Sequence, residues 1–374
     1  MPSLIRALVP LAVCVVSAVL AANDVPTQDA RFTTAVLRSE LIFEQAPFAS
    51  AHASTIVETK SGLVAAWFGG TREGAPDVGI WVSRQVKNRW TDPVEVATGT
   101  PAPSSVAGQA DASRHPCWNP VLFQLPDKQL ALFYKVGPSP QTWWGMRRTS
   151  ADGGETWSEA QRLPDGILGP VKNKPVTLPD GTLLSGSSTE TPERPSKWRV
   201  HFERSADGGR TWTVVRPPDA STPVDAIQPS ILLHPAGRLQ AVGRTRSRRV
   251  FETWSDDGGL TWSPVTLTVL PNPSAGTDAL TLRDGRHLLV YNHTEKGRSP
   301  LNVALSRDGK AWEAAAILEH EPGEYSYPAV IQSADGLVHV TYTWRRLRIK
   351  HVVIDPERLR PVPMSDGQWP AEAR

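Results

Sequence analysis

The sequence predicts an all-β protein folded as a six-bladed β-propeller, and three observations lead to that prediction. A motif of the form Ser-x-Asp-Gly-Gly-x-Thr-Trp recurs along the chain, six strand-turn-strand segments accompany it, and no segment has the apolar period of a helix. Sheets of this size share cores and protect their edges when they are stacked radially around an axis. Two β-sandwiches would also explain many short strands, but not one even repeat.

The recurrent motif has three full copies, SADGGETW, SADGGRTW and SDDGGLTW, and one shortened copy, SRDGKAW. Its aspartates follow one another at intervals of 50 to 55 residues. These aspartates are Asp152, Asp207, Asp257 and Asp308. We interpret them as structural, because Asp and Ser side chains hydrogen-bond turn backbone and glycine supplies left-handed dihedral angles.

The six strand-turn-strand segments contain alternating β-branched and aromatic residues around turns that often include Asp-Gly, which indicates β-hairpins. They begin at His52, Asn119, Lys174, Gln228, Thr277 and Tyr327. Residues 32–44 precede the first segment, and the strand-like RIKHVVID follows the last. We therefore expect the N-terminal strand to join the final blade and close the ring.

Composition excludes several classes of function. Lys and Arg total 40 against 38 Asp and Glu, so the net charge of +2 creates no global field that attracts nucleic acid.

Residues 1–22 place Arg6 ahead of an apolar run that is short for a membrane span, which predicts a secretory signal peptide cleaved near Ala21/Ala22. We expect a secreted or periplasmic monomer, with residues 23–374 as a single propeller domain and Cys117 as its only thiol.

On these residues the chain resembles the sialidase (neuraminidase) superfamily, in which the recurrent motif is called an Asp-box. The resemblance covers nearly the whole chain after residue 22. It implies an axial pocket in which three arginines clamp a substrate carboxylate, a glutamate activates a tyrosine nucleophile, and an aspartate serves as acid and base. Guanidinium groups suit a carboxylate because they are planar and permanently charged.

The resemblance places the nucleophile and two arginines on particular residues. Tyr325, in EYSYPAVIQ, is similar to the family's Tyr-Ser segment at the start of the last blade and is therefore the expected nucleophile. Arg298 lies eight residues before Ser306, like the arginine ahead of a family Asp-box. Among the arginines of RTRSRRVF, Arg249 fits the next position best.

The first two blades supply further expected site residues. In WFGGTREGAPDVG, Arg72 resembles a carboxylate-binding arginine and Asp77 resembles the acid/base aspartate. Asn119, before Pro120, takes the place of a pocket aspartate at the start of the second blade.

Two residues depart from the family pattern. His52-Ala53-Ser54 stands where sialidases have Arg-Ile-Pro, so a histidine replaces one clamping arginine. We count His52 among the candidate catalytic residues, because imidazole exchanges its proton near neutral pH. Gln228 stands where the family has its activating glutamate, and an amide does not act as a base.

Three functions remain open at this point. The first is an exo-acting glycoside hydrolase of sialidase type on a terminal acidic sugar, which the arginines favour because unpaired buried guanidinium groups are costly. The second is a polysaccharide lyase on uronate-containing glycans that uses His, Tyr and Arg. The third is a non-catalytic sugar-binding propeller, in which tryptophans stack on sugar faces. The candidate tryptophans are Trp67, Trp118, Trp143, Trp144 and Trp344.

The same motifs argue against cofactors. No spacing of His, Cys or carboxylate residues indicates a metal site, and no glycine-rich loop opens a helix to hold a phosphate. We expect no cofactor and no metal, and a carbohydrate, most readily an anionic one, as the binding partner.

Overall fold

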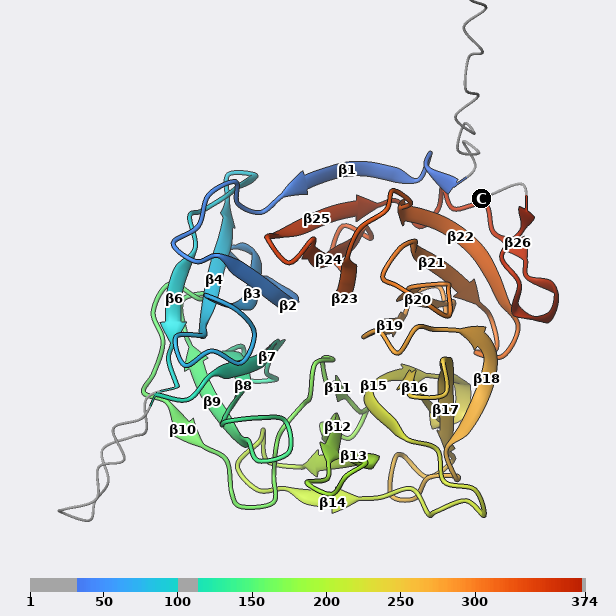
Figure 1. Cartoon of the computed structure of the whole chain (residues 1–374), viewed down its shortest axis with the longest axis horizontal. Helices are drawn as coiled ribbons and strands as arrows, with labels where there is room; N and C mark the ends of the chain where they lie inside the picture. The colour runs from blue at the N-terminus through green and yellow to red at the C-terminus, as the bar shows by residue number, and fades with distance from the viewer. Residues whose placement is uncertain (1–31, 100–113, 372–374) are drawn as a thin grey trace, which may run out of the picture.

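A computed structural model describes residues 32–99 and 114–371. Six sheets surround a common axis, as Figure 1 shows in a view along that axis. The all-β, six-bladed propeller predicted from the repeat is thereby confirmed. The predicted signal peptide, residues 1–22, lies outside the described ranges.

Blades 1 to 3 follow one another along the chain, each running from an inner strand at the axis to the outer edge. Blade 1 contains β2 (Ser50–Thr59), β3 (Gly62–Gly70), β4 (Gly79–Val86), β5 (Arg89–Trp90) and β6 (Val94–Ala97). Blade 2 contains β7 (Cys117–Gln124), β8 (Leu130–Val136), β9 (Trp144–Ser150) and β10 (Gln161–Arg162). Blade 3 contains β11 (Val176–Thr177), β12 (Leu183–Glu190), β13 (Trp198–Ser205) and β14 (Thr213–Val215).

Blades 4 to 6 complete the ring. The short 3-10 helix η2 (Pro235–Gly237) connects the first two strands of blade 4, and η3 (Ser365–Gly367) follows the last strand. Blade 4 contains β15 (Ala226–Leu233), β16 (Leu239–Thr245), β17 (Arg249–Ser255) and β18 (Thr266–Pro271). Blade 5 contains β19 (Asp278–Thr281), β20 (His287–Tyr291), β21 (Leu301–Ser306), β22 (Trp312–Glu319) and β26 (Val362–Pro363). Blade 6 contains β23 (Tyr325–Gln332), β24 (Val338–Trp344), β25 (Arg348–Ile354) and β1 (Val36–Leu41).

The N-terminal strand closes the ring. β1 pairs antiparallel with β25, the third strand of the last blade, and the register places Glu40 opposite His351. The side-chain contact follows the register, because Nδ1 of His351 lies 3.1 Å from Oε1 of Glu40. The first strand of the described chain therefore joins the sheet of the last blade and closes the ring, as predicted.

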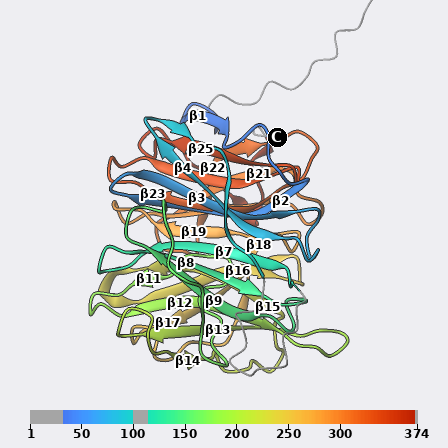
Figure 2. The ribbon, with the colours of Figure 1, turned by 90° about the vertical axis from the view of Figure 1, so that its left-hand side faces the viewer.

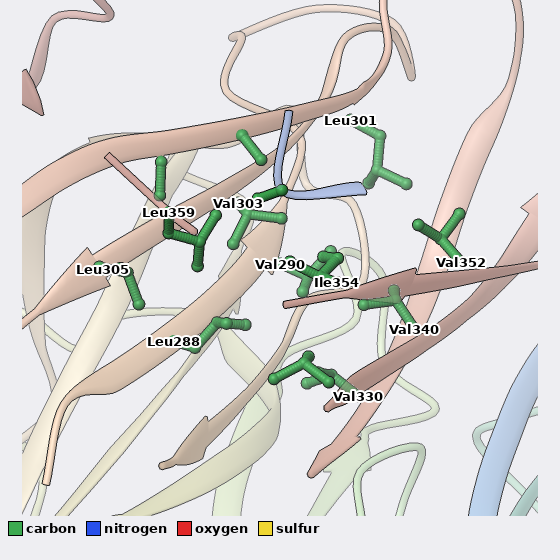
Figure 3. Close-up of a cluster of buried hydrophobic side chains, with 14 of the residues drawn as sticks. Leu288, Val290, Leu301, Val303, Leu305, Val330, Val340, Val352, Ile354 and Leu359 are labelled. Carbon is green, nitrogen blue, oxygen red and sulfur yellow. The ribbon is translucent and has the colours of Figure 1, made fainter. Parts of the chain in front are cut away.

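The hydrophobic core lies between blades. In the close-up of Figure 3, Leu288, Val290 and Val303 of blade 5 face Val340 and Ile354 of blade 6, and all five side chains are fully buried. This sandwich between neighbouring sheets repeats around the ring, and Figure 2 shows the sheets edge on. Burying an aliphatic side chain stabilises a fold by about 1.5–3 kcal/mol, so each blade depends on its neighbours.

The Asp-boxes form self-contained turns between the third and fourth strands of their blades. In the first copy, Oδ1 of Asp152 accepts hydrogen bonds from the Ser150 hydroxyl at 2.7 Å and from the backbone N–H of Thr156 at 2.9 Å. The copies at Asp207 and Asp257 repeat this pattern. The hydroxyl of Thr261 holds the pKa of Asp257 at about 2, because it donates a hydrogen bond to the ionised carboxylate.

Two further observations concern membrane and thiol chemistry. Within residues 32–99 and 114–371, no helix has the length and apolar character needed to cross a membrane. Cys117 is a buried free thiol, and burial raises its pKa far above its ordinary range, so it is unreactive.

Candidate functional site

Four inner strands share a β-bulge near their first residues, at the same end of the propeller. The bulges interrupt the pairing of β2, β7, β15 and β23 with their neighbours. In each bulge a non-glycine residue adopts positive φ, which is uncommon and concentrates at functional sites. These residues are Ala53 (φ 56°), Asn119 (φ 38°), Gln228 (φ 60°) and Tyr327 (φ 52°).

Tyr327 meets an arginine at this end of the axis. Nη2 of Arg244, at the end of β16, donates a hydrogen bond of 2.9 Å to the Tyr327 hydroxyl oxygen. Nη1 of the same guanidinium donates to the carbonyl oxygen of Ser274 at 2.8 Å, and its Cζ lies over the Trp198 ring, 5.1 Å from the ring centroid. Both side chains are buried, so the phenol oxygen is fixed beside a permanent positive charge.

His52 packs directly against this tyrosine. The centroids of the His52 and Tyr327 rings are 4.2 Å apart. Burial, together with the charges of Arg346, Arg298 and Arg244, holds the pKa of His52 well below its ordinary value. The imidazole is therefore neutral at pH 7.

The hydrogen bonds of Thr343 determine the tautomer of His52. Oγ1 of Thr343 accepts a hydrogen bond from the backbone N–H of Ala53 at 3.1 Å and lies 2.9 Å from Nδ1 of His52. A buried hydroxyl proton without an acceptor is costly, and Nδ1 is an acceptor within reach. We therefore assign Nδ1 as the acceptor and place the ring proton on Nε2, which has no hydrogen-bond partner in the described part of the chain. His52 is thus a neutral donor at the axis.

Two more arginines, Arg298 and Arg346, lie near this pair. Arg298 is half-buried, and this burial lowers its pKa; its Nη1 has no hydrogen-bond partner within the described residues. Arg346, in the β24–β25 turn, pairs with the carboxylates of Glu324 and Glu73. Although burial opposes it, these two carboxylates raise the pKa of Arg346. Arg346 is thus neutralised, whereas Arg298 and Arg244 keep charge available for an anion.

A buried lysine also lies near Tyr327. Nζ of Lys172 is 6.0 Å from the Tyr327 ring and donates to the carbonyl oxygens of Thr277 and Pro328. Burial lowers its pKa to about 7, and the nearby Asp278 carboxylate opposes that shift. Because Pro328 directly follows the bulge, Lys172 holds the backbone that gives Tyr327 its position.

The structure does not bring Tyr325, the tyrosine named from the sequence, to the arginines. Its side chain belongs to the apolar cluster between blades 5 and 6, and its hydroxyl oxygen meets Nη2 of Arg345 at 3.3 Å. Successive side chains of a regular strand point to opposite faces, so Tyr325 and Tyr327 would share a face if the strand were regular. The bulge after Ser326 shifts this alternation and turns Tyr327 toward the axis.

Three other sequence-based candidates lie outside the buried cluster around Tyr327. Arg249 begins β17 at the rim, where it pairs with Glu295 at 3.3 Å. Arg72 is exposed on the β3–β4 loop. Asp77, on the same loop, accepts hydrogen bonds from the backbone N–H of Thr71 at 2.8 Å and its hydroxyl at 2.7 Å, and the hydroxyl contact is the main reason that its pKa is lowered.

The remaining candidates do occupy the axial end. Arg298 and His52 lie close enough to interact electrostatically, and Asn119 and Gln228 are buried at bulge positions equivalent to that of Tyr327. Oε1 of Gln228 has no hydrogen-bond partner among the residues described. An amide oxygen there accepts a hydrogen bond but does not take up a proton.

The structure places at the axial end four residues that sequence reasoning missed, and one, Arg244, that it ranked below Arg249. They are Tyr327, Arg244, Arg346, Glu324 and Lys172. One signal identifies the tyrosine: Asn119-Pro120, Gln228-Pro229 and Tyr327-Pro328 are equivalent positions of the repeat. Because Asn119 and Gln228 were already expected at the axis, the repeat itself favours Tyr327 over Tyr325.

The axial groups are chemically matched to an anion. Guanidinium, neutral imidazole N–H and amide groups converge around a phenol, and hydrogen bonds from charged donors are the stronger ones. In the described ranges, no group of three His, Cys, Asp or Glu residues is arranged to hold a metal ion.

Comparison with known proteins identifies the family. Residues 61–340, more than half of the chain, match the family described as BNR repeat-like domain. The chain belongs to this family. A curated relative of this BNR repeat-like protein, the anhydrosialidase of Macrobdella decora, is 25% identical over 268 residues. That match covers 61% of this chain but only 34% of the relative, about a third of its length.

Solved structures agree on the fold of this BNR repeat-like protein. A protein of unknown function from Dyadobacter fermentans superposes with a TM-score of 0.68 at 18% identity, covering 87% of this chain and 99% of the other. The NanB sialidase of Streptococcus pneumoniae superposes with a TM-score of 0.64 at 14% identity, covering 86% and 71%. The resemblance to the sialidase superfamily is thereby confirmed at the level of the fold.

Proposed function

We propose that this protein is a glycan-cleaving enzyme of sialidase type, which removes a terminal acidic sugar with Tyr327 as its nucleophile. The contact between the Tyr327 hydroxyl and Arg244 carries the proposal. A buried guanidinium on a phenol oxygen stabilises the phenolate, which is the nucleophilic form.

The substrate carboxylate binds among the remaining donors. Arg298 and Arg244 supply charge, and Nε2–H of His52 supplies a neutral donor where sialidases have an arginine. A neutral donor binds a carboxylate less strongly than a guanidinium does. We therefore expect weaker substrate binding than a three-arginine clamp gives.

Cleavage proceeds in two displacements. The Tyr327 phenol loses its proton to water, and its oxygen attacks the anomeric carbon while the bond to the leaving oxygen breaks and that oxygen takes a proton from Asp77. Water then attacks the anomeric carbon, the bond to Tyr327 breaks, and Asp77 recovers a proton from that water. Asp77 is assigned this role by resemblance, and its loop reaches the axial cluster through the Glu73–Arg346 ion pair.

A lyase on uronate-containing glycans is the second candidate, and one observation favours it. Tyr327 contacts a guanidinium, and Gln228 replaces the glutamate that would serve as its base. In a lyase, Arg244, Arg298 and His52 would hold the uronate carboxylate while the tyrosine takes the carbon-bound proton and delivers it to the leaving oxygen. This chemistry needs no contribution from Asp77.

A single pair of tyrosine variants tests these functions. Purified protein, Tyr327→Phe and Tyr325→Phe are incubated with sialosides and with uronate-rich polysaccharides, while free acidic sugar and ultraviolet absorbance are both followed. Release of saturated sugar that is lost in Tyr327→Phe and kept in Tyr325→Phe supports the hydrolase. An absorbance rise with the same dependence means a lyase, and inactivity on both substrates contradicts both enzymatic proposals.

A further inference from the structure

A second hollow lies between blades 2 and 3, with a volume of about 210 Å³. Three segments line it: the β8–β9 connection with the start of β9, the loop that follows β10, and the end of β12. The β8–β9 connection and the end of β12 lie at the same end of their blades as the bulges, because inner strands begin where second strands end. The hollow therefore opens on the same face as the axial cluster.

The lining combines aromatic rings with planar polar groups. Trp143 and Trp144 are both half-buried, and the Arg162 guanidinium lies 5.3 Å from the centre of the Trp144 ring. Nε2 of Gln141 donates to Oε2 of Glu190 at 3.2 Å. Aromatic faces that bind C–H surfaces, beside carboxylates and amides that bind hydroxyl groups, form a site suited to a sugar ring.

The charge of the lining excludes a second acidic sugar. Arg162 is paired with Asp165 at 3.1 Å, which leaves the Glu190 carboxylate in excess. Because the Arg162–Asp165 pair is exposed, it is weak and yields readily to a ligand that covers Trp144. The volume is below the roughly 300–1,000 Å³ of pockets for drug-sized ligands, so one ring fits better than an oligomer.

A series of packed rings connects the hollow to the axis. The ring centroids of Trp143 and Trp118 are 6.1 Å apart, those of Trp118 and Phe68 are 6.2 Å apart, and those of Phe68 and His52 are 5.4 Å apart. Trp118 is fixed by a hydrogen bond of 2.9 Å from its Nε1 to the carbonyl oxygen of Gly137. Because each ring packs on the next, the separation between hollow and axis is constant, as simultaneous binding of one glycan requires.

We propose that the hollow between blades 2 and 3 is a subsite for a neutral sugar ring, located on the leaving-group side of the bond that is cleaved at the axis. The proposal rests on the proposed function, since it extends the same substrate outward from Tyr327. It makes the enzyme bind an acidic sugar attached to a neutral oligosaccharide more tightly than the acidic sugar alone.

Paired substrates test the subsite. Activity of the whole protein, Trp144→Ala and Glu190→Gln is measured on 3′-sialyllactose and on the 4-methylumbelliferyl sialoside, which has no leaving-group sugar. We expect about tenfold lower kcat/KM on sialyllactose in both variants and little change on the aryl sialoside. Equal losses on the two substrates, or no loss on either, would overturn the proposal. Glu190→Gln keeps the shape of the side chain, so its result holds even if Trp144→Ala unfolds.

A binding measurement separates this proposal from the proposed function. Tyr327→Phe is titrated with lactose, a neutral disaccharide, while tryptophan fluorescence is recorded. Saturable quenching that Glu190→Gln weakens at least threefold supports the subsite even if no sialoside is cleaved. Absence of saturable lactose binding overturns the subsite, whatever the catalytic assays give.

Discussion

The hydroxyl oxygen of Tyr327 accepts a hydrogen bond of 2.9 Å from Nη2 of Arg244, which lies 83 positions earlier in the chain. The β-bulge of blade 6 and the end of the second strand of blade 4 bring the two together at the axis. Arg249, five residues after Arg244, points to the rim and pairs with Glu295. Substituting Arg244 and Arg249 in turn therefore distinguishes a role at the axis from a role at the rim.

Replacing Arg244 removes the charge beside the nucleophile. We expect Arg244→Met to lower kcat/KM by about 10²–10³-fold, the range seen when one donor that stabilises a transition-state anion is lost. Arg249→Met is expected to change kcat/KM less than threefold. Steady-state kinetics on the substrate that the unaltered protein cleaves measures both, with circular dichroism as the folding control. Similar losses in the two variants would contradict the axial assignment.

The sequence predicted the ring more fully than the site, for a physical reason. The Asp-boxes and hairpins are local, since the partners of Asp152 lie within four positions of it, so their turn geometry is predictable from the local sequence. The direction of an inner-strand side chain depends instead on a bulge, which shifts the alternation by one residue. Tyr325 and Tyr327 therefore could not be distinguished by a Tyr-Ser motif, although the Asn-Pro, Gln-Pro and Tyr-Pro repeat separates them.

The hydrogen bonds of Asp77 predict which leaving groups are cleaved well. Thr71 donates to the carboxylate and lowers its pKa, so little of the proton-donating form exists at neutral pH. We expect aryl glycosides, whose leaving oxygen needs no proton, to be cleaved with a kcat at least tenfold above that for alkyl or sugar leaving groups. Asp77→Ala should lower kcat for sugar leaving groups by about 10²-fold or more and spare aryl substrates.

The control for Asp77 is its hydrogen-bond donor. Thr71→Val removes the hydroxyl contact that depresses the pKa of Asp77, so the alkaline limb of the kcat profile for sugar leaving groups should move to higher pH. An unchanged profile in Thr71→Val would contradict a role for Asp77 as the acid.

Acid should weaken the seam where the ring closes. His339 lies 3.0 Å from both His351 and the Ser333 hydroxyl, and burial, followed by the charge of His351, lowers its pKa from 6.5 to about 4. Below pH 6.5 the unfolded chain binds a proton that the folded protein does not accept until about pH 4. The contribution of His339 to stability is therefore complete above about pH 6.5 and is lost as the pH falls to 4.

Urea unfolding at several pH values measures this effect. The expected loss of unfolding free energy attributable to His339 between pH 7 and pH 4 is on the order of 2 kcal/mol. His339→Gln should show a shallower pH dependence than the unaltered protein, whereas His320→Gln, at an exposed position, should not change the slope. Parallel curves for all three proteins would show that His339 does not titrate in this way.

The Asp278 carboxylate connects four blades at the axis. Its oxygens accept hydrogen bonds from the Ser230 hydroxyl of blade 4 at 2.9 Å, from Nζ of Lys174 at the start of blade 3 at 2.9 Å, and from the backbone N–H of Val330 of blade 6 at 2.8 Å. Removing a buried charge with several partners leaves each of them unsatisfied, which costs about 3–5 kcal/mol.

We therefore expect Asp278→Asn to lower the free energy of unfolding by about 3 kcal/mol or more, while Asp219→Asn, an exposed control, changes it by less than about 0.5 kcal/mol. Because Val330 lies three residues after Tyr327 on β23, loss of this anchor also loosens the bulge that positions the nucleophile. The kcat of folded Asp278→Asn should thus fall with little change in KM. A variant that is destabilised but keeps its full kcat would show that Asp278 holds the ring together without positioning Tyr327.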